Sequence, residues 1–373
     1  MTVMACFEAP GYGGAATANY QRFADLQQRG LKVSWINLLP AEQLSFLMST
    51  FGSQLGNPWN LPDVHNCRIE FPPFHHQPAL GQLLQRLAPS ALVGCGYIAA
   101  WLLQRMAPRV PLTFLTAGFG WAQDLVGTEQ FRDLVSLQRH LSWHGPAGLP
   151  PLHRRQQEAF LACQRCLTHA DMIADLYRCF FPEQIHKIDP HIFWQAGLAF
   201  DEARDFLELA RPFHQRDLDL LFVASRWDRP EKCFPMVVDI AAACPQLRVG
   251  LVGVCDQPPT GCQAFGLIAE RQRLWELLGR SRVLVCPSRF DAAPGILYEG
   301  AAMGCNLVAS PNCGNWSMLH PELLVHRFCA EDFVRRCQLA VAKPYPDQRQ
   351  LLLAQNSQEL LYDRLSSSAN SIL

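Results

Sequence analysis

The chain has 373 residues, of which 49% are hydrophobic and 17% are charged, and its formal net charge is −1. This amount of apolar surface excludes a disordered chain, and the length suits two domains better than one compact core. The sequence has no basic face and no long run of like charge. Duplex nucleic acid is therefore excluded as a partner, and an anionic ligand requires a few well-placed cations.

The amino terminus lacks the basic and then apolar pattern of a secretory signal, because Glu8 and a glycine-rich turn interrupt the first apolar run. No apolar stretch approaches the roughly 20 residues that span a bilayer, which leaves only peripheral membrane contact open. Fifteen cysteines are scattered without tight spacings, a pattern that predicts reduced and mostly buried thiols. We therefore expect a cytoplasmic protein.

Short apolar runs alternate with helical patterns in the first half, which favours α/β layering with mainly parallel strands. A helix is expected over Ala15–Gly30, where the final glycine suits a left-handed cap. The segment from about Trp121 to Leu152 has poor periodicity, and we predict an inserted loop region of a kind that often serves binding. The predicted strands are Thr2–Phe7, Leu31–Ile36, Cys67–Phe71, Ala91–Cys95, Leu112–Thr116 and Met172–Ala174.

The second half repeats this alternation, so two Rossmann-like domains with a cleft between them are expected, over 1–198 and 199–345. A final helix within 346–373, over Gln348–Leu365, is predicted to pack back on the first domain. The predicted strands are Leu218–Ala224, Leu247–Gly253, Val283–Cys286 and Asn306–Ala309; the predicted helices are Glu231–Ala243, Glu270–Ser281 and Pro294–Met303; and Cys255–Cys262 is a predicted loop.

Two cations follow the strand that opens the second half. Arg226 comes just past this strand, and Lys232 opens the next predicted helix. A rigid guanidinium fork and a compact ammonium together suit the oxygens of a diphosphate. Two solvated cations flanking a loop are the simpler alternative, since exposure is the default for Lys and Arg.

Two acids follow the predicted strand Val283–Cys286. Asp291 falls in the loop, Pro294 stands at the expected start of a helix, and Glu299 lies five residues into it. The free N–H groups after Ala293 present the positive end of the helix dipole to an anion. Glu299 has mostly apolar neighbours, so its carboxylate needs a partner. In the first half, Gly13-Gly14 forms a glycine-rich turn between strand and helix, which alone is weak evidence for a ligand.

The order and spacing of these residues resemble the donor-site signature of family-4 retaining glycosyltransferases, which have the GT-B fold. The pattern comprises Arg226 and Lys232, six apart, and then Asp291 and Glu299. Pro294, three residues after Asp291, resembles one subgroup of the family. The resemblance covers roughly 218–320 and the Pro10–Gly14 turn.

The resemblance implies a retaining, metal-independent transfer of a sugar from a nucleotide diphosphate sugar to a glycan, lipid or small-molecule acceptor. Arg226 and Lys232 would bind the diphosphate, Asp291 the transferred sugar and Glu299 the ribose. The other implied donor contacts are Gly13, Gly14, Ala293, Pro294, Gly295, Ile296 and, near the base, Leu267. No cofactor or metal is expected. The first domain would take the acceptor and the second the nucleotide sugar.

The sequence departs from the family pattern at several places. Cys233 follows Lys232 where glycine is usual, and Asp291 replaces a glutamate. Thr116 or Ala117 occupies the place of a histidine that lines the sugar site in many members. The segment Cys313-Gly314-Asn315-Trp316 replaces a glycine pair and a glutamate. These changes motivate an alternative function, a catalytically inactive GT-B-like protein that binds a nucleotide sugar or glycan.

Other motifs have simpler structural interpretations. The Cys163, Cys166 and His169 spacing resembles a metal site but has no visible fourth ligand, so helix-core cysteines are favoured. Asp217-Leu218-Asp219 imitates an Asp-X-Asp metal motif but precedes a strand, which favours a polar strand edge. Weaker candidates are His75-His76 for catalysis, Trp121, Trp143 and Trp194 for sugar stacking, and Arg154-Arg155 for anionic lipid.

Overall fold

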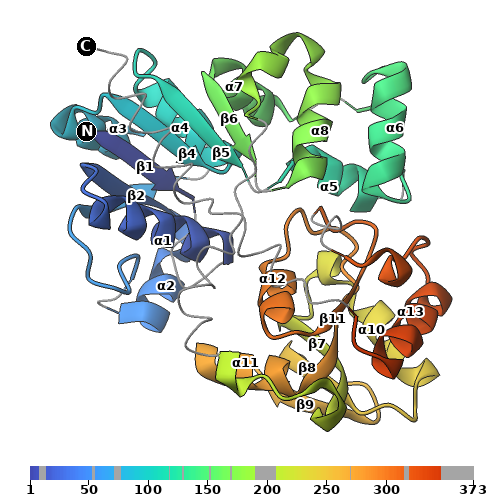
Figure 1. Ribbon diagram of the computed structural model, residues 1–373. Helices are drawn as coiled ribbons and strands as arrows, with labels where there is room; N and C mark the ends of the chain where they lie inside the picture. The colour runs from blue at the N-terminus through green and yellow to red at the C-terminus, as the bar shows by residue number, and fades with distance from the viewer. Residues whose placement is uncertain are drawn as a thin grey trace.

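The computed structural model describes residues 1–7, 14–52, 55–70, 77–116, 118–127, 130–150, 153–168, 170–189, 207–268, 270–314 and 319–345. These residues form two lobes, each built on a parallel sheet (Figure 1). We call residues 1–189 the first domain and residues 207–345 the second. The predicted boundary at 198/199, the segment 346–373 and its helix Gln348–Leu365 lie outside the described residues.

The first domain contains a six-stranded parallel sheet of order β3-β2-β1-β4-β5-β6. Every position of β1 and β2 is buried, as expected for strands covered on both faces. The strands are β1 (Thr2–Cys6), β2 (Val33–Pro40), β3 (Val64–Ile69), β4 (Ala91–Cys95), β5 (Leu112–Thr116) and β6 (Arg165–Thr168). The helices are α1 (Gly14–Gln28), α2 (Leu44–Phe51), α3 (Pro78–Leu87), α4 (Tyr97–Met106), α5 (Gly120–Gly127), α6 (Leu134–His144), α7 (Arg154–Ala162) and α8 (Asp171–Phe180).

The second domain contains a five-stranded parallel sheet of order β11-β10-β7-β8-β9. Its strands are β7 (Leu218–Arg226), β8 (Val249–Val254), β9 (Cys262–Gly266), β10 (Ser281–Cys286) and β11 (Asn306–Ala309). Its helices are α10 (Phe234–Ala243), α11 (Arg271–Arg280), α12 (Gly295–Ala302) and α13 (Ala330–Ala342), and the short helix η6 (Pro230–Lys232) follows β7. The predicted α/β fold of two Rossmann-like units is thus confirmed.

Helices cover both faces of each sheet. Residues of α1 pack with one face of the first sheet, and residues of α3, α4 and α8 pack with the other. In the second domain, α11 and α12 cover one face and α10 and α13 cover the other. Because loops are the only parts of such a sandwich left without a covering layer, ligand-binding groups collect at the strand ends.

Two sequence predictions in the first domain are wrong. Met172–Ala174 was expected to be a strand but lies inside α8, and the sixth strand is Arg165–Thr168. The segment Trp121–Leu152 contains α5 and α6 rather than only a loop. In α6, Leu134, Leu137 and Leu141 are buried at helical spacing, and Asp133 caps its first turn. In the second domain, β9 and α13 were not predicted.

Candidate active site at the carboxyl ends of the strands

The second sheet reverses its strand order next to β7. β7 pairs with β8 on one side and with β10 on the other, so the chain leaves β7 and β10 toward opposite flanks. In open α/β sheets, ligands bind outside the carboxyl ends of the strands at such a point. The loop after β7 carries Arg226 and Lys232, and the loop after β10 carries Asp291.

Lys232 and Asp291 meet at this point although 59 residues separate them. The Lys232 Nζ lies 2.5 Å from the Asp291 Oδ2, and the two side chains are 22% and 18% exposed. Burial opposes the charge on Lys232, but the attraction of Asp291 outweighs it and raises the pKa of Lys232. The structure therefore holds a charged ammonium and a carboxylate side by side in a partly buried place.

Arg226 is the last residue of β7 and is more exposed than Lys232. Its guanidinium is paired with Asp228, with the Nε 3.1 Å from the Asp228 Oδ1, and this hydrogen bond lowers the pKa of Asp228. Within the described part of the chain, Arg226 is paired with Asp228 and not with Asp291. The two predicted diphosphate cations thus flank the same loop but have separate carboxylate partners.

The start of α12 follows Asp291 after three residues, Ala292, Ala293 and Pro294. Pro294 is the residue before the helix rather than its first member, and the helix begins at Gly295. This one-residue shift is a correction that leaves the amides of Gly295 and Ile296 in the first turn, where a helix has no acceptors for its N–H groups. Ala293, Gly295 and Ile296 are half-buried and Pro294 is buried. An anion placed here would also meet the positive end of the helix dipole.

Glu299 lies one turn further along α12 and faces the first turn of α11. Its Oε1 is 3.9 Å from Arg271 Nη2, at the limit of an ion pair, and its side chain is 21% exposed. Sequence reasoning missed Arg271, although a cation opening a helix just after β9 offered a signal. Leu267, in the loop between β9 and Arg271, has 61% of its surface exposed.

The loop carrying Asp291 packs against the first domain. Phe290 belongs to the hydrophobic core of that domain, and Ala292 and Ala293 pack on the same cluster. A Cβ added to Gly314 would lie 2.0 Å from the backbone oxygen of Ala292 and 3.2 Å from the Ala170 Cβ, so three segments meet there with no room for a side chain. The strand ends of the two sheets therefore face one another.

Asn312 makes a polar contact between the domains within the described part of the chain. Its Oδ1 accepts from the Leu134 backbone N–H at 3.2 Å, and its Nδ2 donates to the Arg132 carbonyl at 3.4 Å. Asn312 is 1% exposed, and its own carbonyl accepts from the Asp291 N–H at 3.1 Å. One residue thus connects the start of α6 with the backbone that holds Asp291.

The remaining predicted positions in the first domain contribute less. Gly14 is the first residue of α1, whereas Gly13 and Ala117 lie outside the described residues. The Thr116 hydroxyl donates to the Gly118 carbonyl at 2.6 Å and accepts from the Gly118 N–H at 3.2 Å. Thr116 therefore closes a turn and does not replace a histidine that lines a sugar site.

Two thiols that were not predicted as site residues lie beside the ion pair, and one of them, Cys313, begins the altered segment. Cys286, at the end of β10, has its Sγ 3.7 Å from that of Cys313, and both residues are buried. Their hydrogen bond lowers the pKa of Cys286 and raises that of Cys313. The altered segment that begins at Cys313 thus contributes to the packing under Asp291, while Asn315 and Trp316 lie outside the described residues.

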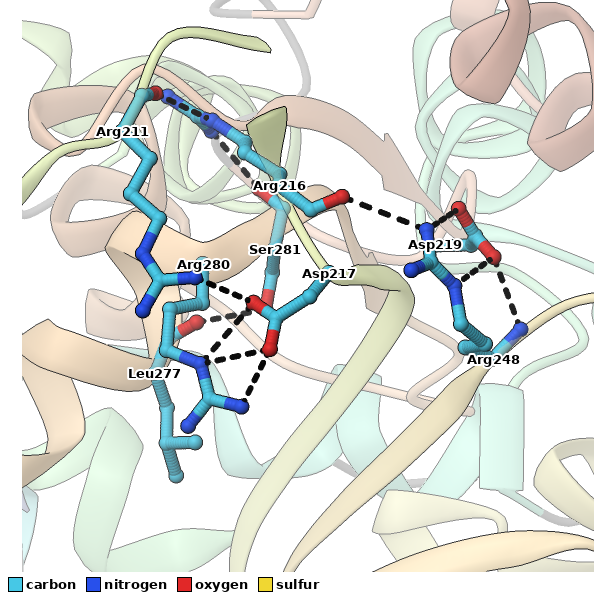
Figure 2. A network of polar contacts seen from close by, with 8 residues as sticks. All are labelled: Arg211, Arg216, Asp217, Asp219, Arg248, Leu277, Arg280 and Ser281. Atoms are coloured by element: carbon cyan, nitrogen blue, oxygen red, sulfur yellow. Dashed lines mark hydrogen bonds and ion pairs between the residues drawn. The ribbon is translucent and has the colours of Figure 1, made fainter. Parts of the chain in front are cut away.

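The two aspartates of the Asp217-Leu218-Asp219 motif pair with arginines at the amino ends of the strands of the second sheet (Figure 2). Asp217 pairs with Arg280, with the Oδ2 2.6 Å from Arg280 Nη2. Asp219 is 5% exposed and pairs with Arg248 at 3.0 Å and Arg282 at 3.1 Å. These carboxylates lie at strand starts, away from Lys232, and their charge is already neutralised.

The other motifs show no chemistry within the described part of the chain. Cys163 and Cys166 are buried, burial raises the pKa of Cys163 to about 12, and no group of three metal-ligand side chains is found among the described residues. Trp121 is buried, whereas Trp143 is exposed. Arg154 pairs with Glu158, as expected for a solvated helix start. His75, His76, His169 and Trp194 lie outside the described residues. Among the helices that the structure describes, none is long and apolar enough to span a membrane.

Comparison with solved structures identifies the fold. The chain superposes on sucrose-phosphate synthase from Thermosynechococcus elongatus with a TM-score of 0.67 and 13% identity, covering 100% of this chain and 99% of the other. Anabaena Alr3699/HepE in complex with UDP and glucose gives 0.63 and 11%, covering 100% of both chains. WaaG, a glycosyltransferase involved in lipopolysaccharide biosynthesis, gives 0.62 and 14%, covering 97% of this chain and 99% of WaaG.

The chain has the GT-B fold. At these identities the comparison shows the fold alone. No protein-family model matches the sequence, and no curated protein matches it either. The assignment of chemistry therefore depends on the side chains of the site.

Proposed function

We propose that this protein transfers a sugar from a nucleotide diphosphate sugar to a glycan, lipid or small-molecule acceptor. The observation that carries the proposal is the ion pair of Lys232 and Asp291 at the strand-order reversal, with Asp291 in the loop that leads into α12. Such an arrangement offers a cation, free amides and a carboxylate within one partly buried place. Diphosphate oxygens suit the first two groups, and sugar hydroxyls suit the third.

The position of Glu299 extends this assignment toward the nucleoside. Glu299 lies further along α12 than the anion-binding turn, and its carboxylate would accept from the ribose hydroxyls while Arg271 steadies it. Exposed Leu267 would contact the base. Anabaena Alr3699/HepE, which shares the fold, has been solved in complex with UDP-glucose, so the fold accommodates a ligand of this class.

The proposed mechanism places positive charge where the reaction develops negative charge. As the bond between the sugar and the diphosphate breaks, Lys232, Arg226 and the amides of Gly295 and Ile296 would stabilise the leaving group. The acceptor hydroxyl would transfer its proton to the departing phosphate. Retention of anomeric configuration and independence from metal are part of the proposal on the strength of the sequence motif.

Two alanine variants test the assignment of the site. Lys232→Ala removes the cation that faces the leaving group, and Glu299→Ala removes the ribose contact. Each should lower transfer by about 100-fold or more, the usual effect of removing a preorganised electrostatic contact, while the far-ultraviolet circular dichroism stays unchanged. The donor is first selected by thermal shift with UDP, GDP and ADP, where a ligand at 100 times its Kd adds about 2.7 kcal/mol of stability. Full activity in either folded variant would refute the assignment.

A binding protein without catalysis is the second candidate. The observation that favours it is the Thr116 hydroxyl, which is engaged by Gly118 and leaves no catalytic group at that position. Both candidates predict donor binding, but only the enzyme predicts turnover. A donor-hydrolysis assay that uses water as the acceptor separates them without knowledge of the natural acceptor.

A further inference from the structure

Arg22 is a buried arginine of the first domain with one hydrogen-bonded side-chain partner among the described residues. It is 4% exposed, its Nη1 donates to the Asn19 Oδ1, and its Nη2 is buried without a hydrogen-bond partner. Among the described residues no carboxylate pairs with it. A buried charge with one neutral partner costs stability, so its retention needs an explanation, of which a bound ligand is one.

Another buried arginine provides the contrast. Arg216 is 5% exposed, but its guanidinium donates to four backbone carbonyls, those of Arg211, Ser281, Met303 and Gly304. Three of these carbonyls belong to the start of β10 and to the residues that follow α12, so the Arg216 guanidinium joins these two segments and has a structural role. Arg22 is about as buried as Arg216 but makes far fewer hydrogen bonds, which indicates a different role.

Arg22 is directed toward the strand ends of the first sheet. Its bond to Asn19 shows that the side chain runs back along α1 toward the beginning of that helix, which follows the carboxyl end of β1. The charge of Arg22 acts on Cys95, the last residue of β4, which lies opposite Cys6, the last residue of β1. β1 and β4 are the neighbouring strands at which the order of the first sheet reverses. The same rule that places a ligand at Lys232 places one here.

We propose that Arg22 binds an anionic group, phosphate or carboxylate, of the acceptor. The inference rests on the proposed glycosyl transfer, because the two sheets face each other through their strand ends and a ligand of the first sheet would meet the sugar held by the second. A guanidinium fork with free donors matches either anion bidentately. The acceptor class is therefore acidic, such as a sugar phosphate, a phosphorylated lipid or a uronic acid.

The experiment compares Arg22→Met with Lys232→Ala in thermal unfolding. The probes are UDP, inorganic phosphate and acetate, with sodium chloride matching the ionic strength. In the wild type, UDP raises the melting temperature, and phosphate or acetate raises it further. Arg22→Met should retain the rise in melting temperature caused by UDP and lose the rise caused by phosphate or acetate. Lys232→Ala should lose the rise caused by UDP and retain the rise caused by phosphate or acetate. Arg22→Lys keeps the charge and should retain part of the anion shift. A response to phosphate or to acetate alone tells a phosphorylated acceptor from a carboxylated one.

The sign of the stability change gives an independent readout. Without ligand, Arg22→Met should raise the melting temperature by a few degrees, because it removes a poorly bonded buried charge. The matched control, Arg216→Met, should lower it by leaving four carbonyls unsatisfied. The proposal is overturned if Arg22→Met melts below the wild type or keeps the full anion shift. If UDP leaves the wild type unchanged while the anion shift still depends on Arg22, the proposed donor fails and the anion site stands.

Discussion

Asp291 keeps Lys232 neutralised before any ligand arrives. In the proposed function, a donor diphosphate would therefore compete with the Asp291 carboxylate for the ammonium of Lys232. This competition suits an enzyme, because a product nucleotide held by an uncompensated lysine would leave slowly. The exposed pair of Arg226 and Asp228 also joins a cation to an aspartate, but water screens it, so its influence on a bound anion is weaker.

Asp291→Asn tests this competition. Removing the carboxylate charge leaves Lys232 free, so we expect UDP to bind several-fold more tightly, in line with a change of about 1 kcal/mol for one nearby charge. Transfer should nevertheless fall, because a neutral amide with one acceptor oxygen binds the sugar hydroxyls less strongly than a carboxylate does. Isothermal titration calorimetry and the transfer assay measure the two effects. Asp228→Asn is the control and should change UDP affinity less; weaker UDP binding by Asp291→Asn would contradict the competition.

At the level of elements, the starts of the strands in the second sheet carry stabilising ion pairs, and their ends carry the candidate site. The starts are fixed by ion pairs, those of Asp219 with Arg248 and of Asp217 with Arg280 (Figure 2). Asp219 also pairs with Arg282. The ends carry the groups proposed to bind the donor. Because the strands are rigid, fixing their starts also fixes the positions of the loops that follow their carboxyl ends.

The Asp219 network makes stability depend on pH. Burial opposes ionisation, but the hydrogen bonds from Arg248 and the charge of Arg282 outweigh it, and the pKa of Asp219 falls below its ordinary 3.8. A lowered native pKa adds stability that is fully present above the unfolded value and lost as the pH falls through the native one. Asp219→Asn should therefore cost about 2–3 kcal/mol at pH 7 and progressively less below about pH 4. Urea unfolding at both pH values measures this, with the more exposed Asp217→Asn as the milder control; an equal loss at every pH would exclude it.

The sequence predicts an element well when the residues that determine it are adjacent in the chain, and poorly when distant contacts determine it. β4, β5 and β11 are found with their observed bounds, because short apolar runs between turn residues mark them. The apolar run Met172–Ala174 resembles a strand, but its position on a buried face of α8 depends on the packing around it. The pairing of Lys232 with Asp291 follows from the topology, whereas the partners of Glu299 and Arg22 depend on side-chain directions that spacing alone does not define.

At the scale of the whole molecule, the described contact between the domains combines the apolar packing of Phe290 with the hydrogen bonds of Asn312. Asn312→Ala would leave the Leu134 N–H without its acceptor in a buried place, which costs about 1–3 kcal/mol. We expect faster hydrogen exchange at the start of α6 and a higher KM for the donor, because Asp291 loses the rigidity of its neighbour. Asn312→Asp keeps the Oδ1 acceptor and should retain the Leu134 bond. Unchanged exchange in Asn312→Ala would show that apolar packing alone holds the domains.

Phe290 adds a consequence for motion. Its ring lies in the core of the first domain, yet its backbone continues β10 of the second and leads directly into Asp291. A rotation that separated the lobes would have to extract this ring from its apolar surroundings, at a cost of about 1.5–3 kcal/mol, or drag the segment away from Lys232. Either way, an opened molecule would separate Asp291 from Lys232, so the proposed donor site would be complete only while the lobes stay in contact.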